Sequence, residues 1–291
     1  MNYENAIFYN ENSAAKLGWT PQWFGEEEFD EELCDAIYEF QQEYGLVADG
    51  MCGSNTFRRI FSQREAEISQ PESGSAKYDN SIVYNGEHFP INWTKVILWD
   101  ETNGLPSKAG HHRKHVGEPR DIKFFVNHWD VCITSKTCHK VLTKRGISVH
   151  FMIDWDGTIY QSLDMQHIGW HAGGRNWNNW SVGVEICNPY YTKYQNWYEK
   201  RGVTRPVITD AEVHGTTLEP HLGFFPMQLE ALRELSLAVH HATGIPLQTP
   251  DSKTVYDPVV NGEYRGFISH FHLTRRKIDC AGLDIDDIIN N

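Results

Sequence analysis

The most informative segment of this sequence is Val149-His-Phe-Met-Ile-Asp-Trp-Asp-Gly-Thr-Ile-Tyr-Gln161. Within it, Asp156-Gly157 separates two apolar runs, and an Asp-Gly pair in that position is typical of a tight turn joining antiparallel strands. Two more apolar runs lie on either side, Phe124-Phe-Val-Asn-His128 and Ser181-Val-Gly-Val-Glu-Ile-Cys187. The segment therefore predicts a hairpin that belongs to a larger sheet.

Two stretches with helical character accompany these strands. Residues 135–145 form a candidate helix that Gly146 would end. Pro226 begins a longer candidate helix that ends at Gly244, and its apolar residues recur at helical spacing. These are Leu229, Leu232, Leu235 and Val239. Strands and helices mixed in this way predict an α/β (α+β) domain over residues 91–291, with a mixed central sheet covered by helices.

Residues 1–62 differ from the rest in charge. They hold twelve acidic and three basic side chains, a net charge of −9 out of −13 for all 291 residues. Apolar positions recur at helical spacing in residues 29–45, and shorter helices are expected at residues 13–17 and after Ser54. We therefore expect a small all-α three-helix domain. Residues 62–80 contain one aliphatic side chain larger than alanine, so residues 63–90 are interpreted as a linker.

Composition excludes several classes of function. The excess of acidic residues argues against a nucleic acid or an anionic membrane as partner. No run approaches the ~20 apolar residues of a membrane helix, and the first residues show no secretory signal. The six cysteines form no Cys-x-x-Cys pair, which argues against a structural zinc ribbon.

Two regions resemble known families. Residues 36–57, with Phe40-Gln41, Gly45-Leu46, Asp49-Gly50 and Gly53-x-x-Thr56, resemble the peptidoglycan-binding three-helix domain of cell-wall hydrolases. Five further pieces are Phe125-Val-Asn-His128, the segment 149–161, Gly169-Trp-His-Ala-Gly173, Asn179-Trp-Ser-Val-Gly-Val-Glu185-Ile, and Ser269-His270 with Lys277-Ile-Asp279-Cys280. In this order and spacing they resemble the zinc-dependent N-acetylmuramoyl-L-alanine amidases, which include phage, bacterial and animal members.

The amidase resemblance implies a Zn²⁺ site. A catalytic zinc takes three protein ligands and keeps a fourth position for water. His128 and His270 match the two ligand histidines of the family, and either Asp279 or Cys280 matches the third ligand. Thiolate chemistry favours Cys280. In the family a catalytic lysine stands two residues before the ligand, and residues i and i+2 of an extended segment face the same side, so the resemblance with Lys277 favours Asp279. We therefore expect Asp279, with Cys280 as the alternative.

The resemblance also implies the remaining roles. Glu185 matches the general base of the recycling-type amidases, since Val149 stands where other members have a tyrosine. Lys277 would stabilise the oxyanion. His171 and Trp170 match substrate-contacting positions. His150 is grouped with them as a substrate-binding residue and is expected to support the site rather than to bind the metal. Cys132 and Cys138 resemble the bridge of animal peptidoglycan-recognition proteins, although two reduced thiols are an equal expectation.

The resulting functional expectation is a monomeric peptidoglycan hydrolase that cuts the amide between N-acetylmuramic acid and L-alanine. The alternative is a non-catalytic peptidoglycan-recognition protein or a virion-associated wall-binding protein. Without a visible signal but with a wall-binding module, the chain resembles a phage endolysin. Such a protein is made in the host cytoplasm and acts on the cell wall after release, without inserting into the membrane.

Overall fold

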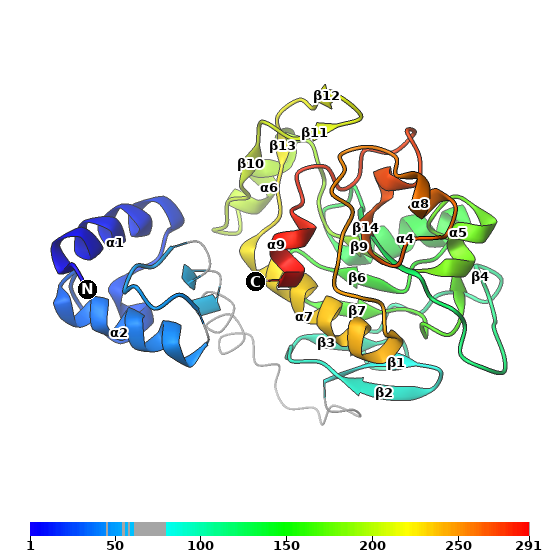
Figure 1. Ribbon diagram of the computed structural model, residues 1–291, viewed down its shortest axis with the longest axis horizontal. Coiled ribbons are helices and arrows are strands. Elements are labelled where there is room, and N and C mark those ends of the chain that lie inside the picture. Colours follow the sequence, from blue (N-terminus) through cyan, green and yellow to red (C-terminus); the bar gives the residue numbers. More distant parts are fainter. Residues whose placement is uncertain (45, 54–55, 58, 61–79, 291) are drawn as a thin grey trace. The chain divides into compact units, whose positions relative to one another are not determined.

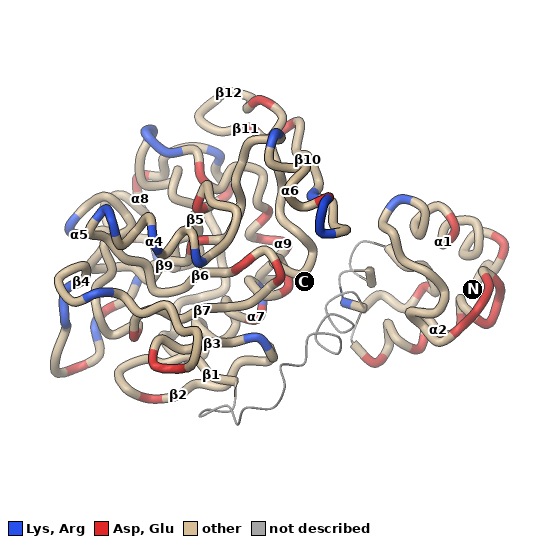
Figure 2. Tube along the Cα trace, turned by 180° about the vertical axis from the view of Figure 1, so that it is seen from behind, with Lys and Arg blue, Asp and Glu red and all other residues tan. Residues whose placement is uncertain are grey.

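The computed structural model describes residues 1–44, 46–53, 56–57, 59–60 and 80–290 (Figure 1). The chain divides into two compact units, Met1–Gly74 and Ser75–Asn291. Acidic residues predominate in the first unit, whereas Lys and Arg are distributed over the second (Figure 2). Most of the expected linker, residues 63–79, lies outside the described residues.

The first unit contains α1 (Tyr3–Leu17), the 3-10 turn η1 (Pro21–Phe24) and α2 (Glu31–Glu43). Helix α1 begins ten residues before the expected start. Its buried face uses small and polar residues, so no apolar stripe revealed it. Asn10 donates to the Gly50 carbonyl over 3.0 Å and accepts from the Cys52 amide over 2.8 Å. These bonds tie α1 to the turn that follows α2.

The core of this unit gathers around α2, whose Leu33 and Ile37 are fully buried against Trp19 and Phe57. Asp30 accepts a hydrogen bond from the Leu33 amide and so caps the helix. Residues 56–57 and 59–60 are helical where the third helix is expected. Its expected start, Ser54, and the expected stop of α2, Gly45, lie outside the described residues.

The second unit is built on a six-stranded sheet with the order β14-β5-β9-β6-β7-β3. Its strands are β3 (Val96–Leu98), β5 (Phe124–Trp129), β6 (Phe151–Ile153), β7 (Ile159–Gln161), β9 (Ser181–Ile186) and β14 (Gly266–Ser269). All neighbours pair in parallel except the β6–β7 hairpin. The predicted mixed sheet is confirmed, including the hairpin around Asp156-Gly157.

A hairpin that the sequence analysis assigned to the linker belongs to this second unit. Strands β1 (Ser81–Tyr84) and β2 (Glu87–Pro90) pair antiparallel. Ile82 is fully buried in the main core, and the Val83 amide donates to the Gln161 side chain over 2.7 Å. The expected linker end at residue 90 is therefore wrong, because the few apolar residues of this hairpin are buried by the domain that follows.

Alternation along the strands gives the sheet two different faces. The core face carries Val182, Val184 and Ile186 of β9 and packs against α7 (Pro226–Thr243), with α9 (Ile285–Asn290) on its far side. The site face carries Ser181, Gly183 and Glu185 of β9 with His128 of β5, and α4 (Ser135–Arg145) and α5 (Arg175–Trp180) lie over it. Helices on both sides confirm the expected layering (Figure 1).

Shorter elements complete the second unit. They are β4 (His112–Arg113), β8 (Ile168–Gly169), η2 (Thr192–Tyr194), α6 (Gln195–Glu199), β10 (Val207–Ile208), β11 (Glu212–Val213), β12 (Thr216–Thr217), β13 (His221–Leu222), α8 (Asp257–Val260) and η3 (His270–His272). Among the described residues, no helix has both the length and the apolar character needed to span a membrane.

Candidate active site

Three neighbouring parallel strands carry the candidate site at their carboxyl ends. His128 lies near the end of β5, directly opposite Glu185 on β9. On the other side of β5, Ser269 of β14 pairs with Asn127, and His270 follows at once. Carboxyl ends of parallel strands meet at one edge of a sheet, which is the usual place for a ligand in such folds. The topology therefore brings together residues that are more than 140 positions apart.

Three ligand-type atoms converge at this edge. His128 Nδ1 lies 2.9 Å from His270 Nδ1 and 3.2 Å from Asp279 Oδ2, and His270 Nδ1 lies 3.0 Å from the same oxygen. All three residues are buried. They form one of two groups of described residues whose atoms are arranged to hold a metal ion. Two imidazole nitrogens and a carboxylate oxygen are a donor set that suits a tetrahedral metal with an open position.

Asp279 and Cys280, the competing candidates, face in different directions. Asp279 points toward the two histidines, as the distances above show. Cys280 is fully buried among the apolar residues of the main core. Although the two residues are adjacent, only the carboxylate belongs to the His128–His270 group.

Burial shapes the electrostatics of this edge. Removal from water, reinforced by nearby His270, lowers the pKa of His128 to about 4, so the ring is neutral at pH 7. Burial alone would raise the pKa of Asp279, but the imidazoles that face it outweigh burial and hold that pKa well below its ordinary value. Burial and then the nearby carboxylates Asp130 and Asp279 raise the pKa of Glu185 well above its usual range.

His171 lies flat against the site face of β9. Its Nδ1 is 3.0 Å from His128 Nε2, and its Nε2 is 3.3 Å from Ser181 Oγ. A Cβ atom on Gly183 would stand 2.5 Å from this ring, so the glycine leaves the space that the imidazole fills. The ring also lines the groove described below, but both of its nitrogens already have protein partners.

His150 has no access to the groove. It is fully buried, its Nε2 donates to the His167 carbonyl over 3.0 Å, and its Nδ1 accepts from the Gly183 amide over 3.2 Å. A substrate contact by His150 is therefore wrong, because the chain encloses its ring completely. His150 is expected to support the site, and its hydrogen bond with Gly183 of β9, the strand beside His171, agrees with that role.

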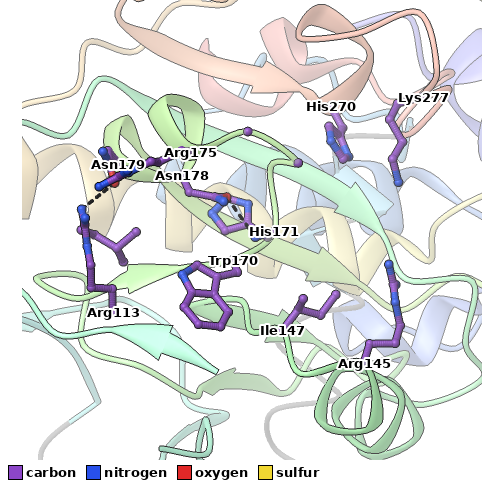
Figure 3. Close-up of a pocket in the computed structure, with 13 residues that line it drawn as sticks. Arg113, Arg145, Ile147, Trp170, His171, Arg175, Asn178, Asn179, His270 and Lys277 are labelled. Carbon is purple, nitrogen blue, oxygen red and sulfur yellow. Dashed lines mark hydrogen bonds between the residues drawn. The ribbon is translucent and has the colours of Figure 1, made fainter. Parts of the chain in front are cut away.

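A groove of about 630 Å³ opens over the site (Figure 3). His270 and Lys277 lie at one end and Arg113 at the other, with Trp170 between them. Arg145 and Arg175 also line it, and none of the described lining residues is acidic. In a chain of net charge −13, a groove with four basic side chains is a local reversal of charge that suits an anionic ligand.

The six cysteines are free thiols in this structure. The expected bridge between Cys132 and Cys138 is not formed, although their sulfur atoms and a carboxylate oxygen of Asp130 lie within 4.8 Å of one another. Both thiols are buried beside Leu142 and Met152.

Sequence reasoning missed several residues of the site. Arg113, Arg145 and Arg175 come from three separate segments, and nothing in their local sequence marks them as neighbours. Ser181 and Gly183 lie within a motif of the sequence, but no role in the site is expected for either from the sequence alone. The period of two that links them to Glu185 is the signal that places all three on one face of a strand.

Comparison with known proteins agrees with this arrangement. Residues 118–279 match the family described as N-acetylmuramoyl-L-alanine amidase, and residues 15–60 match the putative peptidoglycan binding domain. The chain is 22% identical over 208 residues to the N-acetylmuramoyl-L-alanine amidase CwlM of Mycobacterium tuberculosis. That similarity covers 63% of this chain and 47% of CwlM, so the chain spans about half the length of this relative.

Solved structures show weaker likeness. The amidase AmiD from E. coli, in complex with an anhydro-N-acetylmuramic acid peptide, is 21% identical, with 46% of this chain and 49% of AmiD covered and a TM-score of 0.32. The amidase LysC from Clostridium intestinale is 16% identical, with 67% and 95% covered and a TM-score of 0.36. These values carry no functional argument. The match over residues 118–279 spans more than half of the chain, and the protein therefore belongs to the N-acetylmuramoyl-L-alanine amidase family.

Proposed function

We propose that this protein is a peptidoglycan hydrolase that cleaves the amide bond between N-acetylmuramic acid and L-alanine and requires Zn²⁺. The observation that carries the proposal is the convergence of His128, His270 and Asp279 beside a basic groove that His270 also lines. Family membership supports the amidase reaction. The geometry of the three side chains supports a metal-dependent mechanism.

The donor set fits zinc. Two imidazole nitrogens and one carboxylate oxygen, all within 3.2 Å of one another, would hold the ion and leave a fourth position for water. Zinc in such a site lowers the pKa of water and polarises a carbonyl group. Asp279 rather than Cys280 is the proposed third ligand, since the thiol lies in the apolar core.

Glu185 is the proposed general base and acid. Its carboxylate faces the same side of the sheet as His128, and burial gives it an unusually high affinity for a proton. It can accept a proton from the attacking water and then donate that proton to the departing amine nitrogen of L-alanine. The ammonium group of Lys277, at the same end of the groove, would stabilise negative charge that develops on the carbonyl oxygen.

The groove supports a substrate that carries carboxylates. Arg113, Arg145 and Arg175 can receive the acidic groups of a peptide stem, and the indole of Trp170 offers a flat apolar wall. His171 also lines the groove, but both of its ring nitrogens have protein partners, so it offers a substrate no free nitrogen.

Analysis of digested peptidoglycan tests the proposed bond. Purified cell walls treated with the full chain should gain new L-alanine amino termini without new reducing sugar ends. A chelator should abolish this release, and added Zn²⁺ should restore it. New reducing ends would instead identify a glycosidase. Wall binding without any release would support the non-catalytic recognition protein as the function.

The first unit is proposed to bind bacterial cell walls. Its match to a putative peptidoglycan binding domain supports this role, and its net charge of −9 means that attraction is not electrostatic. Binding should therefore survive moderate salt. Removal of residues 1–62 should reduce sedimentation of the protein with purified walls, whereas equal sedimentation with and without them would refute the role. Action on the wall after release from a host cell, as by a phage endolysin, and a monomeric state are part of the same proposal.

A further inference from the structure

A chain of hydrogen bonds leads from the candidate metal site to helix α5. His128 Nε2 lies 3.0 Å from His171 Nδ1, His171 Nε2 lies 3.3 Å from Ser181 Oγ, and Ser181 Oγ lies 2.6 Å from the Trp177 carbonyl oxygen. We call these four residues the His171 relay. Because one end of the relay is a backbone carbonyl, the direction of every bond in it can be derived.

The derivation begins at Trp177. A carbonyl oxygen can only accept, so the Ser181 hydroxyl donates its single proton to it. Ser181 Oγ is then left as the acceptor for His171, which places the proton of that imidazole on Nε2. A neutral imidazole carries one proton, so a neutral His171 with that proton on Nε2 has a lone pair on Nδ1.

The same reasoning continues to the metal site. A lone pair on His171 Nδ1 requires His128 Nε2 to be the donor. A His128 ring with its proton on Nε2 has a lone pair on Nδ1, the atom that lies beside His270 and Asp279 and would bind the metal ion. The opposite arrangement would direct a lone pair of His171 at Ser181 Oγ, whose proton is already given to Trp177.

We infer that His171 is a positioning residue, which holds His128 in the one tautomer that can bind a metal through Nδ1. This inference rests on the metal site of the proposed function and adds a role that the groove alone does not indicate. A histidine that binds a metal must carry its proton on the other nitrogen, and a fixed partner for that proton strengthens binding.

Strand β9 is built around this ring. Ser181 anchors one ring nitrogen, and Gly183, two residues on, makes room for the imidazole. The φ of Gly183 is not in the left-handed region, so the glycine is needed for space and not for backbone conformation. Asn178 of α5 accepts from the backbone amides of His171 and Ala172 over 3.1 and 2.8 Å, which fixes the loop that carries the ring.

The first test is nuclear magnetic resonance of the zinc-loaded full chain with ¹⁵N-labelled histidine at pH 7. His171 should be neutral with its proton on Nε2. A His171 ring with its proton on Nδ1 would overturn the inference. This measurement does not depend on whether any variant folds.

The second test is the dissociation constant for Zn²⁺, measured by competition with a chelator. His171→Leu should weaken binding about 10–100-fold, the usual effect of losing the partner of a ligand histidine. Gly183→Ala should weaken it to a similar degree, because the new methyl group displaces the ring. Ser181→Ala should have a smaller effect in the same direction. His171→Asn should recover part of the loss, since its Oδ1 can accept from His128.

A matched control is His221→Leu. His221 is also fully buried. Its Nδ1 donates to the Glu219 carbonyl over 2.9 Å, and neither residue belongs to the His171 relay. This variant should bind Zn²⁺ as the unmodified chain does. Equal affinity in His171→Leu and the unmodified chain, or equal losses in His171→Leu and His171→Asn, would refute the relay. Failure of the unmodified chain to bind Zn²⁺ would instead refute the metal site of the proposed function.

Discussion

Along β9, neighbouring side chains meet two different environments. Val182, Val184 and Ile186 are fully buried on the core face, against α7 and the apolar residues of β5 and β6. Ser181, Gly183 and Glu185 alternate with them on the site face, where they meet imidazoles and carboxylates. The core face stabilises the fold by burying apolar surface. The site face buries a carboxyl group, which has a free-energy cost unless the group is neutral or paired.

This contrast separates stability from chemistry along one strand. A change on the core face should alter the free energy of unfolding and leave the affinity for metal intact. A change of a catalytic or metal-binding residue on the site face should alter hydrolysis or metal affinity instead. Asp279 and Cys280 repeat the pattern at the end of the chain, because one faces the histidines and the other lies in the apolar core.

The largest effect is expected at that pair. Asp279→Ala should lose Zn²⁺ and all hydrolysis, because it removes the carboxylate from the three-atom group. Cys280→Ala should keep Zn²⁺ and activity and lose on the order of 1 kcal/mol of stability through a small cavity. Metal analysis and chemical denaturation check both variants. A metal-free Cys280→Ala protein beside a zinc-loaded Asp279→Ala protein would reverse the ligand assignment.

Glu185→Gln should give the next largest effect. It keeps the size of the side chain but removes the group that accepts and donates the proton, so the rate should fall by about 10²–10⁴. Zinc content and the unfolding temperature should be retained. The measurement is release of L-alanine amino termini from purified walls. Turnover near that of the unmodified chain would remove Glu185 from the mechanism.

Ile186→Ala is the matched change on the core face. Ile186 is fully buried in the apolar core and follows Glu185 directly. Its truncation should lower the free energy of unfolding by about 2–5 kcal/mol. The zinc dissociation constant of the folded variant should stay unchanged. Denaturant titration and metal competition provide the two readouts, and a large loss of metal affinity with little loss of stability would break the contrast between the faces.

A smaller, pH-dependent effect is expected at Asp154, which follows β6 on the site face. Burial raises the pKa of Asp154 from 3.8 to about 6. A raised pKa means that the folded state prefers the protonated acid, so this stabilisation is complete below about pH 4 and is lost as the pH rises through 6. The Asp154→Asn variant carries an asparagine side chain, which does not titrate. Its stability relative to the unmodified chain should therefore improve by roughly 1–3 kcal/mol between pH 4 and pH 8.

Thermal unfolding of both proteins at the two pH values measures this difference. The amide keeps an oxygen that can accept from the Ser135 and Trp155 amides, as Oδ1 of Asp154 does. A difference in stability that is the same at pH 4 and pH 8 would show that folding does not raise the pKa of Asp154.

The thiols offer a related test on the same side of the sheet. Cys132 and Cys138 are free and close together, so oxidation to a bridge stays a prediction. A bridge over so short a loop would add roughly 2–3 kcal/mol of stability. Counting of free thiols on the oxidised protein checks it, and six reactive thiols after unfolding would exclude the bridge.

Short-range signals in the sequence determined much of the fold. The Asp156-Gly157 turn, the stop of α4 at Gly146 and the span of α7 were predicted correctly because each depends on a few neighbouring residues. The start of α1 and the hairpin at residues 81–90 were not predicted. Each has few buried residues, and those residues pack against segments that are distant in the sequence.

The sequence by itself also determined which residue types stand in the site, because the motifs that contain His128, Glu185 and His270 could be recognised in order. Only the tertiary structure decided what each side chain faces. The interval from His270 could not separate Asp279 from Cys280, since adjacent residues differ in direction and not in distance along the chain. The partners of His171 were equally hidden, because Ser181 and His128 reach it from two strands whose register is set by pairing across the sheet. Hydrogen bonds between distant segments depend on that register, and no local pattern encodes it.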